Sequence, residues 1–400
     1  MISPPALPLR GFASDHSPPR RILIRGVNWL GDAVLSTPAL HRLRERFGEA
    51  RITLLTHEKL AELWRYHPSI DEVITFPHRA GLWAVAARIR AGQAVADRFD
   101  FALVFPNSPR SALEVWLARV PRRIGYARPP RNWGLTQAVP RRPAHSPMHR
   151  RSVNEINRLV EPATGRPQPL PRTFPSCAHQ IFEYLHLAAA LGADPNPVPP
   201  GLTVMPEEIE AVISKFGLGA VIRRGAPVFG LIPGAEYGPA KCWPVERFAA
   251  AARELGQRTQ CAWLMLGGRA DTSVTAQVAS ALLGGKDLVQ DLAGRTSLRE
   301  LCALLKVCGV VLTNDTGPMH VAAALGTPVV VPFGSTSPEL TGPGLPGDQR
   351  HRVLRAGAPC TPCFRRTCPI DFRCMTGISV ASVVDAVLQV APAWAGKRAL

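Results

Sequence analysis

The residues best suited to chemistry in this chain lie in three short polar segments, and the first is 314–320, with the sequence NDTGPMH. It follows an apolar run and precedes an Ala-rich segment, and this order of strand, turn and helix presents backbone N–H groups to a phosphate. Thr316 adds a hydroxyl, and Gly317 permits close backbone approach. We expect Asp315, which would repel a phosphate, to contact sugar hydroxyls or to orient a lysine. His320 is either a hydrogen-bonding partner of this site or a packing residue.

A lysine and an aspartate stand in the other two segments. Lys241 ends the loop 233–241 in a chain whose basic residues are nearly all arginine, so we interpret it as a phosphate contact rather than a solvated charge. Asp32 ends the segment 26–32, with the sequence GVNWLGD. No Lys-Ser/Thr pair follows, and Asn28 occupies the second glycine position of a dinucleotide fingerprint, so neither phosphate-loop pattern is met. Asp32 is therefore either a helix N-cap or a general base.

Strand-like apolar runs alternate with helical patterns around all three segments. The predicted strands are 21–25, 51–55, 72–76, 101–105, 228–232, 262–266, 310–313 and 329–333, and the predicted helices are 33–47, 60–66, 82–96, 180–191, 245–254, 298–307 and 320–325. This alternation is typical of βαβ units with parallel sheets. We therefore predict an α/β fold of two Rossmann-like halves facing each other across a cleft. Loops at the carboxyl ends of parallel strands line such clefts, so the three segments and 267–271 should face it.

Length and composition set the class of protein. The chain has 400 residues, of which 46% are hydrophobic and 19% charged, which indicates a globular protein of two or three domains. Dense prolines between 161 and 206 mark a boundary, so we predict a disordered leader at 1–20, domains at 21–200 and 201–385, and a tail at 386–400. No apolar run reaches the roughly 18 residues of a spanning helix, and the leader lacks the apolar centre of a signal peptide. We expect a cytoplasmic protein.

The positive charge is unevenly distributed. The net charge is +17, and heavy use of arginine, alanine and proline also fits a compositional bias of the genome. The stretch 115–154 contains no Asp or Glu but nine arginines, and six prolines break it into loops. This pattern predicts an arginine-lined surface for an anionic partner. Nucleic acid, a phosphorylated small molecule and an anionic membrane lipid all fit that surface.

Four of the nine cysteines lie close together, at 360, 363, 368 and 374. A Cys-x-x-Cys pair followed by two more thiols suits zinc, but the usual spacing of two such pairs is absent. Loop packing and disulfide formation are the alternatives, and we predict no bound metal.

Several motifs together resemble one known family, the ADP-heptose:lipopolysaccharide heptosyltransferases. They are N-W-L-G-D-A-V-L-S-T-P-A-L at 28–40, P-G-A-E-Y-G-P-A-K-C-W-P at 233–244, L-A-G-R-T-S-L at 292–298, N-D-T-G-P-M-H-V-A-A-A-L-G-T-P at 314–328 and P-C-F-R-R-T-C-P-I-D-F-R-C-M-T-G-I at 362–378. The last is most similar to the subgroup that adds the second heptose. The resemblance implies a GT-B fold and an inverting, metal-independent glycosyltransferase, with an N-terminal acceptor-binding domain and a C-terminal nucleotide-sugar domain. We expect the protein to be a monomer.

The resemblance also implies roles for individual residues. Asp32 matches the catalytic base, and Lys241 matches the lysine that contacts the phosphate and sugar of the donor. The other donor-binding positions are Thr296 in the adenine pocket, Asp271 near the ribose, Asp315 at the sugar, Thr316 and Gly317 at the diphosphate, and His320 one turn later.

The resemblance implies ADP-heptose as the donor substrate, no other cofactor, and the first heptose of the phosphorylated inner core on lipid A as the acceptor. We assign acceptor binding at the cytoplasmic membrane face to the acid-free stretch, through Arg122, Arg123, Arg141 and Arg142. Alternatives are a transferase for another core heptose, or a nucleotide-sugar epimerase or other Rossmann enzyme, against which the missing glycine fingerprint counts. A nucleic-acid-binding protein fits the charge but not the ordered motifs, so we predict no nucleic-acid partner.

Overall fold

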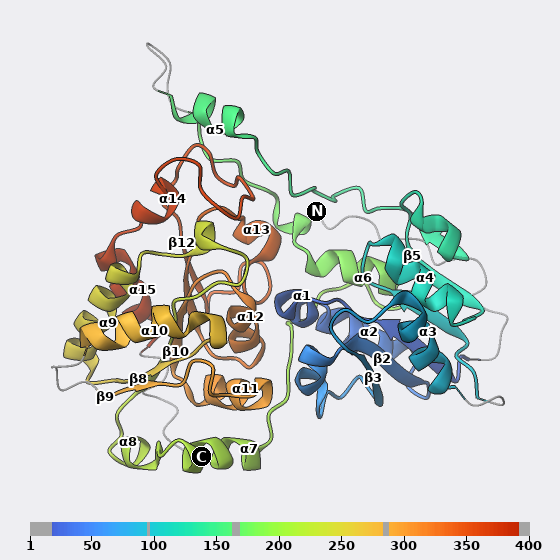
Figure 1. The fold of residues 1–400 in the computed structure, drawn as a ribbon, viewed down its shortest axis with the longest axis horizontal. Helices are drawn as coiled ribbons and strands as arrows, with labels where there is room; N and C mark the ends of the chain where they lie inside the picture. Colours follow the sequence, from blue (N-terminus) through green and yellow to red (C-terminus); the bar gives the residue numbers. More distant parts are fainter. Residues whose placement is uncertain (1–17, 94–96, 162–168, 283–287, 392–400) are drawn as a thin grey trace. The chain divides into compact units, whose positions relative to one another are not determined.

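The computed structural model describes residues 18–93, 97–161, 169–282 and 288–391. These residues form two compact units. The first unit runs to His145 and includes Gln180–Thr203, and the second contains Ser146–His179 and the chain from Val204 onward (Figure 1). Each unit is built on its own six-stranded sheet.

The sheet of the first unit is entirely parallel, with strand order β3-β2-β1-β4-β5-β6. Helices α2 and α6 pack together, as do α3 and α4. Its strands are β1 (Arg21–Arg25), β2 (Arg51–His57), β3 (Glu72–Phe76), β4 (Phe101–Val104), β5 (Arg122–Tyr126) and β6 (Gln137–Val139). Its helices are α1 (Leu30–Leu35), α2 (Thr37–Arg46), α3 (Leu82–Ala91), α4 (Pro109–Leu117) and α6 (Ile181–Ala189), with 3₁₀ turns at Glu58–Trp64 and Arg131–Gly134.

The second unit repeats this design with strand order β12-β11-β10-β7-β8-β9, again entirely parallel. Its strands are β7 (Val228–Ile232), β8 (Ala262–Met265), β9 (Leu288–Asp291), β10 (Val310–Thr313), β11 (Val329–Pro332) and β12 (Arg352–Leu354). Its helices are α5 (Val153–Val160), α7 (Pro206–Lys215), α8 (Gly219–Arg223), α9 (Val245–Thr259), α10 (Thr272–Leu282), α11 (Leu298–Val307), α12 (Gly317–Ala324), α13 (Pro338–Thr341), α14 (Arg373–Thr376) and α15 (Val380–Val390), with 3₁₀ turns at Ser176–Ala178, Pro239–Lys241 and Arg269–Asp271. The predicted parallel α/β fold is confirmed.

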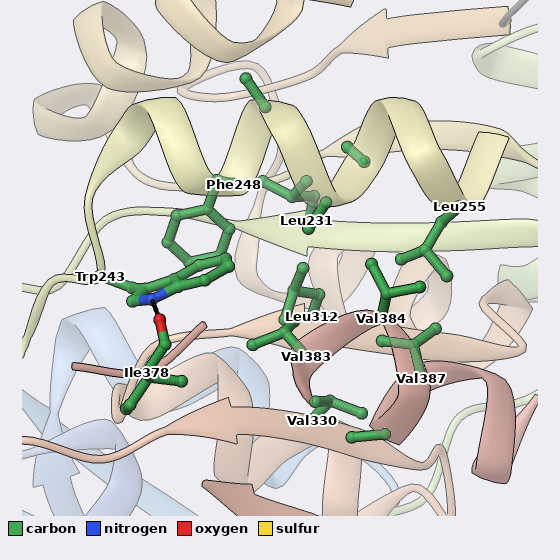
Figure 2. Close-up of a cluster of buried hydrophobic side chains, with 14 of the residues drawn as sticks. Leu231, Trp243, Phe248, Leu255, Leu312, Val330, Ile378, Val383, Val384 and Val387 are labelled. Carbon is green, nitrogen blue, oxygen red and sulfur yellow. Dashed lines mark hydrogen bonds between the residues drawn. The ribbon is translucent and has the colours of Figure 1, made fainter. Parts of the chain in front are cut away.

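The core of the second unit lies between its sheet and helices α9 and α15 (Figure 2). Leu231 and Leu312 extend from the sheet toward Phe248 of α9 and Val384 of α15, and all four are buried. Trp243 closes one end of this core, where its Nε1 donates a hydrogen bond to the carbonyl of Ile378 (3.1 Å). Burying aliphatic and aromatic side chains of this size contributes roughly 1.5–3 kcal/mol each.

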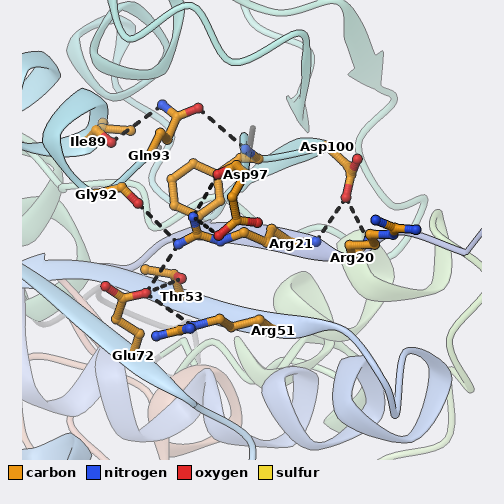
Figure 3. A network of polar contacts seen from close by, with 11 residues as sticks. Arg20, Arg21, Arg51, Thr53, Glu72, Ile89, Gly92, Gln93, Asp97 and Asp100 are labelled. Atoms are coloured by element: carbon orange, nitrogen blue, oxygen red, sulfur yellow. Dashed lines mark hydrogen bonds and ion pairs between the residues drawn. The ribbon is translucent and has the colours of Figure 1, made fainter. Parts of the chain in front are cut away.

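In the first unit a buried arginine ties the amino end of the sheet together (Figure 3). The guanidinium of Arg21 pairs with Glu72 of β3 (3.2 Å) and with Asp97 (3.0 Å), and it also donates to the carbonyl of Gly92 (3.1 Å). Asp100 accepts the backbone N–H of Arg21 (2.9 Å). Since Glu72 begins β3, and Asp97 and Asp100 precede β4, the network connects the start of β1 with the starts of β3 and β4.

The first unit differs from the predicted elements in several places. The predicted helix 60–66 is a 3₁₀ helix at Glu58–Trp64, and the predicted helix 82–96 ends at Ala91, with 94–96 outside the described residues. The predicted helix 33–47 begins earlier, at Leu30, and it breaks at Ser36 because the Ser36 and Thr37 hydroxyls bond back to the preceding turn and Pro38 lacks an N–H. The stretch 115–154, predicted as loops, contains β5 and β6.

The division into units also differs from a single cut at residue 200. Residues 146–179 join the second unit because the N–H of Arg151 bonds to the carbonyl of Cys363 (3.0 Å) and Ile156 packs in the second core. Residues 180–203 return to the first unit, where Tyr126 donates to the carbonyl of Glu183 (2.7 Å). Helix α15 extends through the start of the predicted tail to Val390. The predicted leader lies outside the described residues as far as residue 17.

Within the part of the chain that the structure describes, none of the helices has both the length and the apolar character needed to cross a membrane.

Candidate functional site

The predicted donor residues of the second unit all follow the carboxyl ends of adjacent strands. Lys241 follows β7, Asp271 follows β8, Thr296 follows β9 and Asp315 follows β10. The sheet order places β10, β7, β8 and β9 next to one another. This edge of a parallel sheet is where α/β proteins bind nucleotides, so the topology brings together residues that are far apart in the sequence.

A buried ion pair forms the centre of this edge. Lys241 Nζ lies 2.6 Å from Asp315 Oδ2, and only 14% of the lysine side chain and 3% of the aspartate side chain are exposed. The Thr336 hydroxyl donates to the same carboxylate oxygen (2.5 Å). The Tyr237 ring also contacts the lysine, with Nζ 4.9 Å from the ring centroid. The pair therefore holds an ammonium group in one place at the carboxyl edge of the sheet.

Asn314 joins the two loops that carry this pair, a role that sequence reasoning missed. Its fully buried side chain accepts the backbone N–H of Trp243 (2.9 Å) and donates to the carbonyl of Pro233 (2.7 Å). Both partners belong to the loop after β7. An amide can do both because it carries an acceptor and a donor. The sequence signal that could have identified Asn314 is a polar amide directly after an apolar strand.

The residues predicted to contact phosphate, Thr316 and Gly317, lie at the start of α12. Thr316 is the extended N-cap residue, and its side chain makes no capping hydrogen bond. Gly317 is the first helical residue and both are half-buried. Pro318 has no N–H, and the N–H of Met319 bonds to the Thr316 carbonyl (3.2 Å). The Gly317 N–H, at the positive end of the helix dipole, is therefore the backbone donor that this helix start can offer to a ligand. The arrangement suits a phosphate held beside the Lys241 ammonium.

His320, one turn into α12, is buried with 5% of its surface exposed. Burial lowers its pKa to about 4, although the nearby Asp315 carboxylate acts in the opposite direction. Its Nδ1 has no hydrogen-bond partner among the described residues. At neutral pH the ring is therefore uncharged, and it leaves one polar atom for a ligand or water.

This burial predicts acid-sensitive stability. The folded-state pKa of about 4 lies below the unfolded value of about 6.5, so the unfolded chain takes up the proton first. Stability is therefore complete above about pH 6.5 and is lost as the pH falls toward 4. We expect the free energy of unfolding to fall by about 2 kcal/mol more in wild type than in His320→Gln between about pH 7 and pH 5. Urea unfolding at both pH values measures this difference, and equal losses in the two proteins would contradict it.

Asp271 and Thr296 lie at the far end of the edge. The Asp271 carboxylate accepts the N–H of Gly268 (2.8 Å) and packs against Gly234, where an added Cβ would lie 2.0 Å from Oδ1. An added Cβ at position 234 would force the Asp271 side chain to shift, so the carboxylate reaches the loop after β7. Thr296 is half-buried and directly precedes Ser297, the N-cap of α11. Their predicted ribose and adenine contacts stay predictions.

Asp32, the predicted base, belongs to the first unit. It lies in the first turn of α1, and the N-cap is Trp29, so the alternative of Asp32 as the N-cap is wrong. Gln180 Nε2 donates to Asp32 Oδ1 (3.0 Å) and also lies 2.8 Å from the Tyr184 hydroxyl. Burial, assisted by the Asp32 carboxylate, raises the Tyr184 pKa well above its usual value, so the phenol stays neutral. Sequence reasoning missed Gln180, because no local pattern relates it to Asp32.

A second buried ion pair positions the segment before Asp32. Arg25 Nε bonds to Glu114 Oε2 (2.8 Å), and the two side chains are almost fully buried. The same guanidinium donates to Asn28 Oδ1 (3.0 Å). Removing one member of such a pair typically costs about 3–5 kcal/mol because it leaves an unpaired buried charge. The turn that carries Asp32 is thus held from within the core.

The predicted acceptor arginines do not form the free cationic surface that the acid-free stretch suggested. Arg142 is buried with 7% exposed and pairs with Glu183 (3.2 Å), which comes from outside the stretch. Arg123 donates to the carbonyls of Gly134 (2.8 Å) and Val120 (2.7 Å). These two side chains bond within the first unit, and their predicted role in acceptor binding stays a prediction. Arg122 is half-buried and Arg141 contacts His145 (3.0 Å), and their role at the acceptor stays a prediction.

The four clustered cysteines pack in the second unit. Cys360, Cys363 and Cys374 are buried, and all four are free thiols. Burial, and then the neighbouring thiols, raise the pKa of Cys374 to about 12. The Cys368 sulfur accepts the N–H of Phe372 (3.4 Å). Among the described residues, no group of three or more His, Cys, Asp or Glu side chains has the arrangement to hold a metal ion.

Comparison with known proteins agrees with this geometry. The family model of glycosyltransferase family 9 (heptosyltransferase) matches residues 88–372. Lipopolysaccharide heptosyltransferase 2 of Salmonella typhimurium is 30% identical over 344 residues, which is 84% of this chain and 88% of the relative. Lipooligosaccharide heptosyltransferase 2 of Haemophilus ducreyi is 29% identical over 81% of this chain and 86% of the relative. The structure of E. coli ADP-heptose lps heptosyltransferase II matches with a TM-score of 0.72 at 25% identity, covering 94% of this chain and 99% of that chain.

Two parallel Rossmann-like units with polar segments at their carboxyl edges define a glycosyltransferase of the GT-B class. The chain belongs to glycosyltransferase family 9, the heptosyltransferases.

Proposed function

We propose that this protein transfers L-glycero-D-manno-heptose from ADP-heptose to the first heptose of the lipopolysaccharide inner core, as a heptosyltransferase II. The observation that carries the proposal is the buried Lys241–Asp315 pair beside the start of α12. It lies at a nucleotide-binding edge in a chain that matches several proteins named heptosyltransferase 2 over most of its length. The donor substrate is the only small molecule that the proposed reaction needs.

The proposed reaction is a single displacement at the anomeric carbon of the donor heptose. An acceptor hydroxyl attacks that carbon while the bond to the ADP oxygen breaks on the opposite face, which inverts the configuration. Asp32 accepts the hydroxyl proton, and Gln180 holds its carboxylate in place. The diphosphate leaves with added negative charge, which Lys241 and the N–H of Gly317 stabilise. Fixed positive groups thereby take the part that a divalent cation plays in other glycosyltransferases.

The acceptor also determines where the protein acts. We propose that the protein acts at the inner face of the cytoplasmic membrane, because the acceptor is anchored there by lipid A. We also propose that it works as a monomer. Exposed arginines of the first unit, such as Arg119 and Arg128, supply charge for contact with an anionic surface.

The test is transfer by the purified full chain. ADP-heptose is combined with an acceptor that carries one inner-core heptose, in the presence of a chelator, and ADP release and acceptor mass are followed. We expect one heptose to be added. A parallel reaction uses an acceptor that already carries the second heptose. Transfer only to that acceptor would support the alternative of a transferase for a later core heptose, and transfer to neither would contradict the proposal.

A further inference from the structure

A tryptophan stands beside the proposed base in the first unit. Trp29 directly precedes α1, and Asp32 is the third residue of that helix. The N–H of Ala33 bonds to the carbonyl of Trp29 (2.9 Å), which closes the first helical turn. Side chains at the first and fourth positions of such a turn are neighbours, with about 5–6 Å between their Cβ atoms. The Trp29 and Asp32 side chains therefore start from the same side of this turn.

Helix stability does not account for a tryptophan at this position. The residues that stabilise a helix from the N-cap are Ser, Thr, Asp and Asn, whose side-chain oxygens accept the free N–H groups of the first turn. Trp29 makes no such capping hydrogen bond, and 47% of its surface is exposed. A small polar residue would therefore serve the start of α1 better than this large, half-covered ring does.

A lysine from the neighbouring strand restrains the Trp29 ring. Strands β1 and β2 are paired in parallel, so the chain segments that follow them leave the same edge of the sheet side by side. His57, the last residue of β2, accepts the backbone N–H of Lys59 at Nδ1 (3.1 Å). The Lys59 ammonium lies over the indole, with Nζ 5.3 Å from the ring centroid, and the ring quadrupole attracts this charge. The contact keeps the ring at the edge that carries Asp32.

We propose that the Trp29 ring is the platform on which the reacting sugar of the acceptor rests, and that it determines which sugar is presented to Asp32. The platform rests on the proposed function, and all of its groups belong to the first unit. A sugar hydroxyl that reaches the Asp32 carboxylate brings its own ring against the side chain at position 29. The carbon-bound hydrogens of a pyranose ring form an apolar patch, and an indole that covers it removes apolar surface from water. Lys59 acts through the ring and is a positioning residue.

Trp29→Ser tests the platform and separates binding from folding, because serine is a preferred N-cap residue. We expect the acceptor KM to rise by about tenfold, as for the loss of the apolar contact of one aromatic side chain. The donor KM should stay within about twofold of wild type, and the thermal unfolding temperature should not fall by more than about 3 °C. Trp29→Phe should recover part of the acceptor affinity. Lys59→Met should raise the acceptor KM by about two- to fivefold, the weight of an exposed cation–π contact.

Trp116→Ser is the matched control. Trp116 has the same exposed fraction, 47%, but it lies in the last turn of α4, which runs from the carboxyl end of β4 toward the start of β5. We expect its acceptor KM to equal that of wild type. An unchanged acceptor KM in Trp29→Ser, an equal rise in Trp116→Ser, or a rise in the donor KM alone would overturn the platform.

Calorimetry with the deacylated acceptor saccharide and no donor keeps this test independent of transfer. Weaker binding to Trp29→Ser than to wild type and Trp116→Ser supports the platform, and equal binding to all three proteins overturns it. If wild type binds this saccharide through Trp29 but adds no heptose to it, the proposed reaction fails and the platform stands as a sugar-binding contact.

Discussion

Asp32→Asn is expected to lower kcat for heptose transfer by about 10²–10⁴, the usual contribution of a general base. The substitution keeps the size of the side chain, and the asparagine oxygen can still accept the Gln180 hydrogen bond, so the loss reports the missing proton acceptor rather than a changed shape. Single-turnover rates at saturating donor and acceptor measure the effect. ADP binding, followed by calorimetry, should stay unchanged because the predicted nucleotide contacts lie in the second unit.

Gln180→Ala is the companion variant for this prediction. Gln180 touches Asp32 but not the substrates in the proposed mechanism, so it is a positioning residue. We expect a fall of about tenfold in kcat with little change in either KM, consistent with a misplaced rather than a missing base. A kcat for Asp32→Asn within tenfold of wild type would remove Asp32 from the role of base, whatever Gln180→Ala does.

Lys241→Met is expected to lower kcat/KM for ADP-heptose by about 10²–10³, the typical loss when one fixed group that stabilises developing charge is removed. The same change leaves the Asp315 carboxylate buried without its cation. Loss of one member of a buried pair costs about 3–5 kcal/mol of stability, so the activity of this variant alone does not separate chemistry from folding.

A double variant separates the two effects. Lys241→Met with Asp315→Asn removes both charges, and the thermal unfolding temperature should recover most of the loss, since no charge is then left buried and unpaired. Transfer should stay as low as in Lys241→Met. If activity returns together with stability, the lysine is structural, and the leaving diphosphate must be stabilised by other groups.

The local pattern of the sequence was sufficient for the central elements. The predicted bounds of β1, β3, β7, β10 and α11 match the structure, because each is a buried apolar run or a clear helical period next to a turn signal. The strands β5, β6, β9 and β12 were not predicted. Each is short or polar, and β6, β9 and β12 lie at the edge of a sheet, where the neighbouring strand supplies much of the order.

Long-range contacts account for what the sequence analysis missed at the site. Gln180 reaches Asp32 across 148 positions, and Asn314 reaches Pro233 across 81. The stretch 115–154 has no acidic residue of its own, as the sequence analysis noted. The analysis missed that folding brings Glu183 from outside the stretch to Arg142. The segment 146–179 likewise joins the second unit through bonds to a loop some two hundred residues later.

The sequence by itself therefore determined the parallel α/β class and the identity of the polar segments, since both depend on side-chain periodicity and on residues adjacent in the chain. Only the tertiary structure decided which charges are paired and which stay available to a ligand. Lys241 pairs with Asp315, whose carboxylate also accepts a hydrogen bond from Thr336, and Arg142 pairs with Glu183. Each outcome depends on groups that are brought together by sheet order and helix packing rather than by neighbouring positions in the sequence.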